Sequence, residues 1–171
     1  MAKPEPRSSE ALDAERILRA LADHEVEYVV IGGLAVQTHG HVRTTNDVDL
    51  IPAPERANLE RLSAALRALR ARVLNPGYEQ AEIHADLLPR AAIWQFDSVG
   101  GGLDVVHEAP GAAPYAELRD RALVVELDDL RVPVAGLDDL VRMKLARGRP
   151  VDRDDVAALT DPGTGSAGDR T

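Results

Sequence analysis

The sequence predicts an α+β fold, in which helices pack on a mixed β-sheet and further helices follow at the C-terminus. Helical and strand-like patterns alternate in the first half of the chain, and pairs of short strand-like runs follow in the second half. At 171 residues the chain has the size of one domain with its own core. We expect that domain over residues 9–160, between a disordered N-terminus at 1–8 and a disordered tail at 161–171.

The first half is expected to alternate between helices and strands. Its three helices and two strands are predicted, in the order α-β-α-β-α, at residues 9–23, 27–31, 34–39, 47–51 and 54–73. Ser9 can cap the first helix, and the Gly32-Gly33 pair interrupts the first strand before the short helix. Pro54 suits the first turn of the last helix, whose apolar residues recur at steps of three and four as far as Val73.

The second half is expected to contain two strand pairs and three helices. The strands are predicted at 92–97, 103–107, 123–127 and 131–135, and the helices at 114–121, 137–146 and 152–159. The first strand pair is expected to turn at glycines 100–102 and the second at aspartates 128–129. Residues 75–77 form a turn, and residues 78–91 fit a helix or a loop equally well.

The composition excludes several classes of site. The chain has no cysteine, so it has no disulfide, zinc–thiolate site or thiol nucleophile. The N-terminus lacks the apolar region of a secretory signal. The longest nearly uncharged apolar run, 28–36, is too short to span a bilayer. We therefore expect a cytoplasmic protein without membrane partners.

The charge balance argues against a broad nucleic-acid interface. The formal net charge is -9, whereas proteins that hold a duplex over a wide face usually have an excess of basic residues. One Trp and one Phe offer few stacking surfaces for single strands. A local basic patch can still meet a structured RNA, so RNA stays possible as a substrate.

Two aspartates interrupt the strand predicted at 47–51. Asp47 and Asp49 share one face of that strand, because side chains two residues apart point the same way, while Val48 and Leu50 face the core. Neighbouring carboxylates repel each other and are costly to desolvate, unless water or a cation compensates them. A solvated strand edge is the commoner explanation, and a magnesium site shared with substrate phosphates is the functional one.

Asp104 extends this pattern to a second predicted strand. If the two strands are neighbours, Asp47, Asp49 and Asp104 converge, which is enough to hold two metal ions for phosphoryl or nucleotidyl transfer. Between the first strand and the short helix, Gly32-Gly33 leaves bare backbone N–H groups that a phosphate can approach. The sequence around these glycines is neither a Walker loop nor a Rossmann fingerprint.

These residues carry a resemblance. The stretch VIGGLAVQTHGHVRTTNDVDLI resembles the signature of the DNA polymerase β-type nucleotidyltransferase superfamily. The spacing of Arg43, Thr45 and Asp47 is similar to that of small stand-alone bacterial members, including the nucleotidyltransferase toxins of type IV abortive-infection systems. The segment LDDLVRMKLARGRPVDRDDVAAL resembles the end of that group, so the likeness extends over residues 27–159.

The resemblance implies a nucleotidyltransferase-like mixed sheet and an NTP-dependent enzyme, with ATP as one possible substrate. It would bind a nucleoside triphosphate with two Mg²⁺ ions and transfer the nucleotide to an acceptor hydroxyl. Gly32 and Gly33 would cradle the triphosphate, and Asp47 and Asp49 would hold both metals. Asp104 would hold the catalytic metal and act as general base.

Three further residues are candidates for nucleotide binding. Lys144 lies in an apolar helical stripe, where it either snorkels to solvent or delivers an ammonium to the triphosphate. Arg43 and Thr45 precede Asp47 in a loop. They either contact phosphate or only supply ordinary loop polarity.

Other polar residues are expected to have structural roles. Asp152 is expected to cap the last helix, with a direct catalytic role as the alternative. Arg149 and Arg153 are expected to be solvated, although phosphate binding stays open for both arginines. His107 is a candidate for lining the pocket. The other expectations are surface positions for His39 and His41 and a solvated face for the five arginines of the helix at 54–73, with an RNA-facing patch as its alternative.

The acceptor stays open at this point. An RNA end, a protein hydroxyl and a small molecule, as in aminoglycoside adenylylation, all suit the chemistry. The toxin interpretation comes from the resemblance and implies an antitoxin partner. Two different hypotheses are a catalytically inactive module that binds a nucleotide or partner, and an acidic interaction domain whose aspartates are only surface charge.

Overall fold

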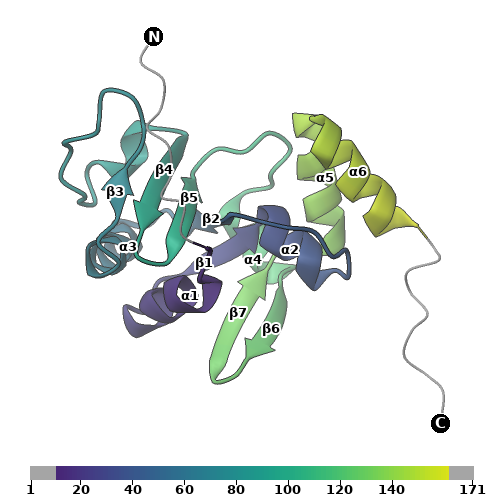
Figure 1. Cartoon of the computed structure of the whole chain (residues 1–171), viewed down its shortest axis with the longest axis horizontal. Coiled ribbons are helices and arrows are strands. Elements are labelled where there is room, and N and C mark those ends of the chain that lie inside the picture. Colours follow the sequence, from purple (N-terminus) through teal and green to yellow (C-terminus); the bar gives the residue numbers. More distant parts are fainter. Residues whose placement is uncertain (1–10, 162–171) are drawn as a thin grey trace.

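The computed structural model describes residues 11–161, which form one mixed seven-stranded sheet with helices on both of its faces (Figure 1). The sheet order is β3-β4-β5-β2-β1-β7-β6. The strands are β1 (Tyr28–Ile31), β2 (Asp47–Pro52), β3 (Arg72–Val73), β4 (Ile93–Ser98), β5 (Gly101–Val106), β6 (Leu123–Leu127) and β7 (Leu130–Val134). The α+β class predicted from the sequence is confirmed. The segment expected to be disordered at 1–8, and most of that at 161–171, lie outside the described residues.

Six α-helices are described between residues 11 and 161. They are α1 (Ala14–Asp23), α2 (Gly32–Thr38), α3 (Arg56–Ala68), α4 (Tyr115–Asp120), α5 (Leu137–Arg147) and α6 (Pro150–Thr160), and a 3₁₀ turn, η1, spans Leu88–Arg90. Figure 1 shows α5 and α6 side by side at the end of the molecule where α2 lies. The last two helices therefore stand next to the Gly-Gly segment that begins α2.

The two faces of the sheet carry different cores. The larger core packs α1 and α3 against one face and includes the fully buried Trp94 and Phe96. The opposite face carries a smaller apolar cluster, in which Ile31 and Val106 meet Leu118 of α4 and Met143 of α5. The polar side chains of β2 and β5 lie on this second face, next to the smaller cluster.

The two central strands that carry the aspartates, β2 and β5, are parallel to each other. β2 runs antiparallel to β1 and parallel to β5, and β1 runs parallel to β7. β6 forms one edge of the sheet and exposes Leu123, Val124 and Leu127. The interior position of β2 and β5 buries their apolar side chains and fixes the direction of their polar ones.

Two predicted helix boundaries are wrong. The first helix begins at Ala14, because the Asp13 carboxylate accepts the backbone N–H of Arg16 at 3.0 Å and caps the helix there; Ser9 lies outside the described residues. The helix predicted to reach Val73 ends near Ala68, since Arg70 adopts a left-handed φ of 51° that stops it. Val73 then pairs with Phe96 in the sheet.

Smaller differences concern the turns. The hairpin between β4 and β5 turns at Val99 and Gly100, so that Gly101 and Gly102 are part of β5. The reason is local: the Ser98 hydroxyl accepts the Gly100 N–H and donates to the Gly101 carbonyl, which closes the hairpin early. Residues 78–91, undecided from the sequence, are turns and loop apart from η1.

Candidate active site

The three predicted carboxylates lie on one face of the sheet. In the parallel pair of β2 and β5, Asp49 is opposite Asp104 and Asp47 is opposite Gly102. Residues opposite each other on neighbouring strands point to the same face. Asp47, Asp49 and Asp104 are only partly buried, whereas Val48 on the other face is fully buried.

A polar cavity of about 300 Å³ opens on this face. It is lined by the eight residues that the sequence predicted to hold the metal ions or the nucleotide: Gly32, Gly33, Arg43, Thr45, Asp47, Asp49, Asp104 and Lys144. Arg147 and Arg149 also border it, from the end of α5 and the start of α6. The fold thus brings together the Gly-Gly turn, the acidic strands and the C-terminal helices, although they are far apart in the sequence.

The Gly-Gly pair is required by close contacts. Gly32 has a φ of +70°, and a Cβ atom there would lie 2.1 Å from Oδ2 of Asp49. A Cβ atom at Gly33 would lie 2.8 Å from Oγ1 of Thr45 and 2.9 Å from Nη2 of Arg43. Bare backbone therefore meets the carboxylate on one side and the polar loop on the other.

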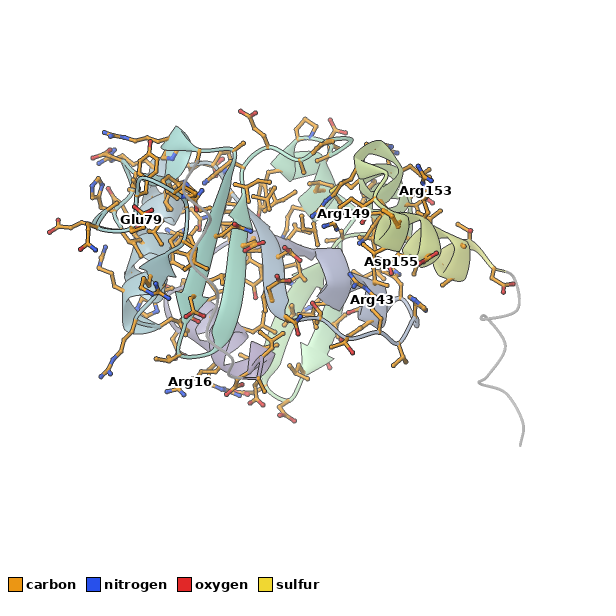
Figure 2. The ribbon with its side chains drawn as sticks, turned by 45° about the horizontal axis from the view of Figure 1, so that its top comes forward. Arg16, Arg43, Glu79, Arg149, Arg153 and Asp155 are labelled. Atoms are coloured by element: carbon orange, nitrogen blue, oxygen red, sulfur yellow. The ribbon has the colours of Figure 1, made fainter. Side chains whose placement is uncertain are left out.

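The loop between α2 and β2 is held by hydrogen bonds. The Thr45 hydroxyl donates to the backbone carbonyl of Asp47 at 3.0 Å, and the Gln37 side-chain amide donates to the carbonyl of Arg43. Nε of Arg43 lies 3.2 Å from Oδ1 of Asp155 in α6. Figure 2 shows Arg43 beside Asp155 where this loop passes the last helix. The contact between Arg43 and Asp155 is an ion pair without hydrogen-bond geometry, and it holds the Arg43 side chain beside the cavity.

Lys144 does not snorkel to solvent. The residue is only 5% exposed, and its Nζ atom lies 2.8 Å from Oδ2 of Asp155 and 3.2 Å from Oδ1 of Asp152. Of the two alternatives that the sequence left open for Lys144, snorkelling is therefore excluded, because α6 covers the apolar stripe of α5 with two fully buried carboxylates. Lys144 still borders the polar cavity, so its ammonium lies between the cavity and these carboxylates.

We name Arg43, Lys144, Arg149, Asp152 and Asp155 the ionic cluster. Asp152 was expected to cap the last helix, but α6 begins at Pro150 and Asp152 lies within its first turn. Its carboxylate still accepts the Arg149 backbone N–H at 3.2 Å, and Nε of Arg149 donates to it at 2.9 Å. The cluster ties the start of α6 to α5 and to the loop before β2.

Acid is expected to weaken this cluster. Burial alone raises the pKa of Asp152, but hydrogen bonds from Arg149 and Lys144 outweigh it and hold the pKa at about 2. Because this folded-state pKa lies below the ordinary value of 3.8, Asp152 stabilises the fold above about pH 4. That contribution is lost as the pH falls from 4 to 2. In urea unfolding across this range, the Asp152→Asn variant should lose less stability than the parent; equal losses would contradict the assignment.

The histidines are spread over different surroundings. His107 is not among the residues lining the polar cavity; its Nε2 atom is buried without a hydrogen-bond partner within residues 11–161, and burial lowers its pKa. His39 is partly exposed, and its Nε2 atom lies 2.8 Å from the carbonyl oxygen of Ala135. His41 lies 3.8 Å from Asp155, at the edge of the ionic cluster. Arg153 is exposed, as expected.

Asp155 was missed by the sequence reasoning. It is fully buried and lies beside Lys144 and Arg43, from two different segments. One signal was present: Asp155 follows Asp152 by three residues, which places both on the same face of a helix. The charge pattern alone does not predict the short turn at Gly148, which folds that face onto α5.

The donor chemistry at the polar cavity fits a hard cation only in part. Carboxylates are suitable ligands for Mg²⁺, and the strand register sets three of them on one wall. Within residues 11–161, however, no three His, Asp or Glu side chains already form a group that could hold a metal ion. A bound ion would therefore have to draw these carboxylates together.

Comparison with known families identifies the chain. The sequence of residues 11–160 matches the family described as "Nucleotidyltransferase of unknown function (DUF6036)". The chain belongs to this family. The nucleotidyltransferase superfamily predicted from the Gly-Gly and Asp-x-Asp pattern is thereby confirmed, and the likeness to abortive-infection toxins stays a prediction. No curated protein matches the chain.

Solved structures share the fold of this nucleotidyltransferase. The lincosamide antibiotic adenylyltransferase LnuA, with lincomycin bound, is similar with a TM-score of 0.61 at 14% identity, over 88% of this chain and 98% of its own. The antibiotic-resistance factor ANT(2'')-Ia gives a TM-score of 0.54 at 18% identity, over 85% and 80%. An antigenic nucleotidyltransferase-like protein from Paracoccidioides brasiliensis gives 0.51 at 17% identity, over 91% and 78%. At these identities the likeness concerns the fold.

Across the described part of this nucleotidyltransferase, no helix has the length and apolar character needed to cross a bilayer.

Proposed function

We propose that this nucleotidyltransferase uses Mg²⁺ to move the nucleotide of a nucleoside triphosphate onto a hydroxyl group of a small molecule. The observation that carries the proposal is the position of Asp47, Asp49 and Asp104 on one wall of the polar cavity. The bare backbone of Gly32 and Gly33 borders the same cavity, where a phosphate can approach it closely.

The cavity has a cationic side and an anionic side. Arg43, Arg147 and Arg149 border it from the loop and the C-terminal helices, and their charges suit a triphosphate. Thr45 and Lys144 complete this side. Asp47, Asp49 and Asp104 would hold the two magnesium ions, which, when bound, would neutralise charge on the phosphates.

The proposed transfer needs no reactant other than the triphosphate and the acceptor. The acceptor oxygen forms a bond to the α-phosphorus of the triphosphate, and the bond from that phosphorus to the oxygen shared with the β-phosphate breaks. Pyrophosphate leaves with that oxygen and its electron pair. The carboxylate of Asp104 takes the proton of the attacking hydroxyl, which is the role of a general base.

A small-molecule acceptor is better supported than RNA. Trp94 and Phe96, the only Trp and Phe of the chain, are fully buried in the larger core and offer no stacking surface. On α3, Arg61 and Arg67 donate to the backbone carbonyls of Glu25 and Ile83, which weakens the case for an RNA-facing patch there. Related folds adenylylate lincosamides or hold adenylyl-2''-tobramycin. An RNA-directed toxin with an antitoxin partner is the alternative.

Labelled triphosphates test the proposal. The purified chain is incubated with Mg²⁺, each α-labelled triphosphate, and either total RNA, an aminoglycoside or a lincosamide, and pyrophosphate release is measured. We expect release with a small-molecule acceptor and a loss on the order of 100-fold in Asp104→Asn, because a positioned general base contributes that much. Labelled RNA ends would support the toxin instead. A catalytically inactive module would bind triphosphate in a thermal-shift assay without releasing pyrophosphate.

The matched control is Asp97→Asn. Asp97 is also a strand aspartate, but it faces Arg72 at 3.6 Å and is not among the residues lining the polar cavity. Its substitution should leave pyrophosphate release unchanged. Equal losses in the two variants would contradict a special role for Asp104.

A further inference from the structure

A second cavity, of about 220 Å³, lies against the polar one and has a different character. Its walls are mostly apolar, with Ile31, Ile93 and Val106 from the sheet and Leu140 and Met143 from α5. We call it the apolar cavity. It is smaller than the 300–1,000 Å³ typical of ligand pockets, so it suits one compact group rather than a large ligand.

The two cavities meet at the acidic strand. Gly32, Asp49, Lys144 and Arg147 border both of them. Along β5, Asp104 lines the polar cavity and Val106, two residues further on the same face, lines the apolar one. A molecule in the apolar cavity therefore has one end beside Asp49 and the position where the transfer would occur.

The chemistry of the apolar walls excludes most alternative occupants. A triphosphate would lose its hydration against Ile93 and Val106, because the charged residues of this cavity, Asp49, Lys144 and Arg147, stand only where it meets the polar one. A nucleobase presents several polar edge atoms that the apolar part of these walls cannot bond, and none of the described residues that line this cavity is an aromatic that could stack on a base. A polycationic sugar would likewise place charged groups against apolar walls, where they would lose their hydration. What fits is an apolar group that carries a hydroxyl at its polar end.

We propose that the apolar cavity is the acceptor subsite and that the acceptor is an amphiphilic alcohol, with an apolar body and one hydroxyl directed at Asp49. This inference rests on the proposed function. It names the class of substrate: the apolar body fills the cavity between β4, β5 and α5, and the hydroxyl oxygen attacks the α-phosphorus as described above. The hydroxyl proton goes to Asp104 and pyrophosphate leaves.

Primary alcohols of increasing length are the probe. Transfer of label from the preferred triphosphate to 1-butanol, 1-hexanol and 1-octanol is compared with transfer to glycerol, a polar alcohol. Each added CH₂ that enters the cavity should raise kcat/KM on the order of three-fold until the cavity is full. Equal transfer to glycerol and to 1-hexanol overturns the inference.

A matched pair of variants tests the location. Ile93 lines the apolar cavity and is 43% exposed, and Leu123 on β6 is 49% exposed and does not line it. Both are exposed apolar residues on strands, so replacing either with serine should leave the fold intact. Ile93→Ser should flatten the dependence on chain length, whereas Leu123→Ser should keep it. The same slope in both variants overturns the assignment of the cavity.

A binding measurement gives a readout independent of turnover. The chain has two methionines, of which Met143 lines the apolar cavity. With ¹³C-methyl methionine, 1-hexanol should shift the Met143 signal in a saturable way and glycerol should not. If the chain binds and transfers nucleotide but Met143 does not respond, only the acceptor inference fails. If the chain binds no nucleotide in the thermal-shift assay, the proposed function fails, and this inference falls with it.

Discussion

Gly32→Ala is expected to remove detectable nucleotide transfer and to lower the melting temperature. Gly32 adopts a φ of +70°, which costs an alanine about 1–2 kcal/mol. The added methyl group would also lie 2.1 Å from Oδ2 of Asp49, far inside van der Waals contact. Either the carboxylate or the turn has to move, and both belong to the proposed site.

Gly77→Ala is the control that separates the backbone strain of a positive φ from the steric clash with Asp49. Gly77 has a similar φ of +86°, but a Cβ atom there would have no neighbour within 4 Å. It should therefore show the backbone penalty in thermal unfolding and keep full pyrophosphate release. Gly32→Ala should show both losses. A Gly32→Ala protein as active as Gly77→Ala would mean that the close contact with Asp49 has no role in transfer.

Lys144→Met is expected to cost about 3–5 kcal/mol of unfolding free energy, because removing one partner of a buried ion pair leaves an uncompensated charge. Here two carboxylates are affected, since Asp152 and Asp155 are both fully buried beside the ammonium. Methionine keeps much of the volume of the lysine side chain, so the lost unfolding free energy reports the removed charge rather than lost packing. Urea unfolding at neutral pH measures it.

Arg142→Met is the control on the same helix. Its side chain is 55% exposed, and its buried partner Asp139 keeps two hydrogen bonds from Arg121 at 2.7 and 2.8 Å. Exposed pairs contribute about 1 kcal/mol or less, so this variant should stay close to the parent. If Lys144→Met were equally mild, the ionic cluster would not hold α5 and α6 together.

The local part of this site follows from the sequence. Alternation within β2 fixes which side chains face the core, because the period of a strand is two, and this separates Asp47 and Asp49 from Val48. The break that the Gly32-Gly33 pair was expected to make is found where β1 ends at Ile31. Both inferences use neighbours along the chain and need no knowledge of distant segments.

The contacts of the site between residues far apart in the sequence do not follow from local sequence patterns. The pairing of Asp49 with Asp104 depends on strand register across a long connection, which local patterns do not specify. The apolar stripe of α5 left open whether Lys144 reaches solvent or the triphosphate, and only the return of α6 turns that position into a buried one. In the same way Val73 continued a helical pattern, but the left-handed turn at Arg70 sends it into the sheet. In each case a tertiary contact overrides the local preference.

The position of α6 has a consequence for how the protein is made. Arg149 and Val151 complete the wall of the polar cavity, and Asp155 holds Arg43 from the last helix of the described chain. The ribosome synthesises β2 and β5, which carry the aspartates, before α6. A growing chain that has reached only Arg147, or a chain cut there, would hold every carboxylate of the proposed site and still lack two lining residues of the polar cavity, so the proposed nucleotide site is complete only once α6 has been made.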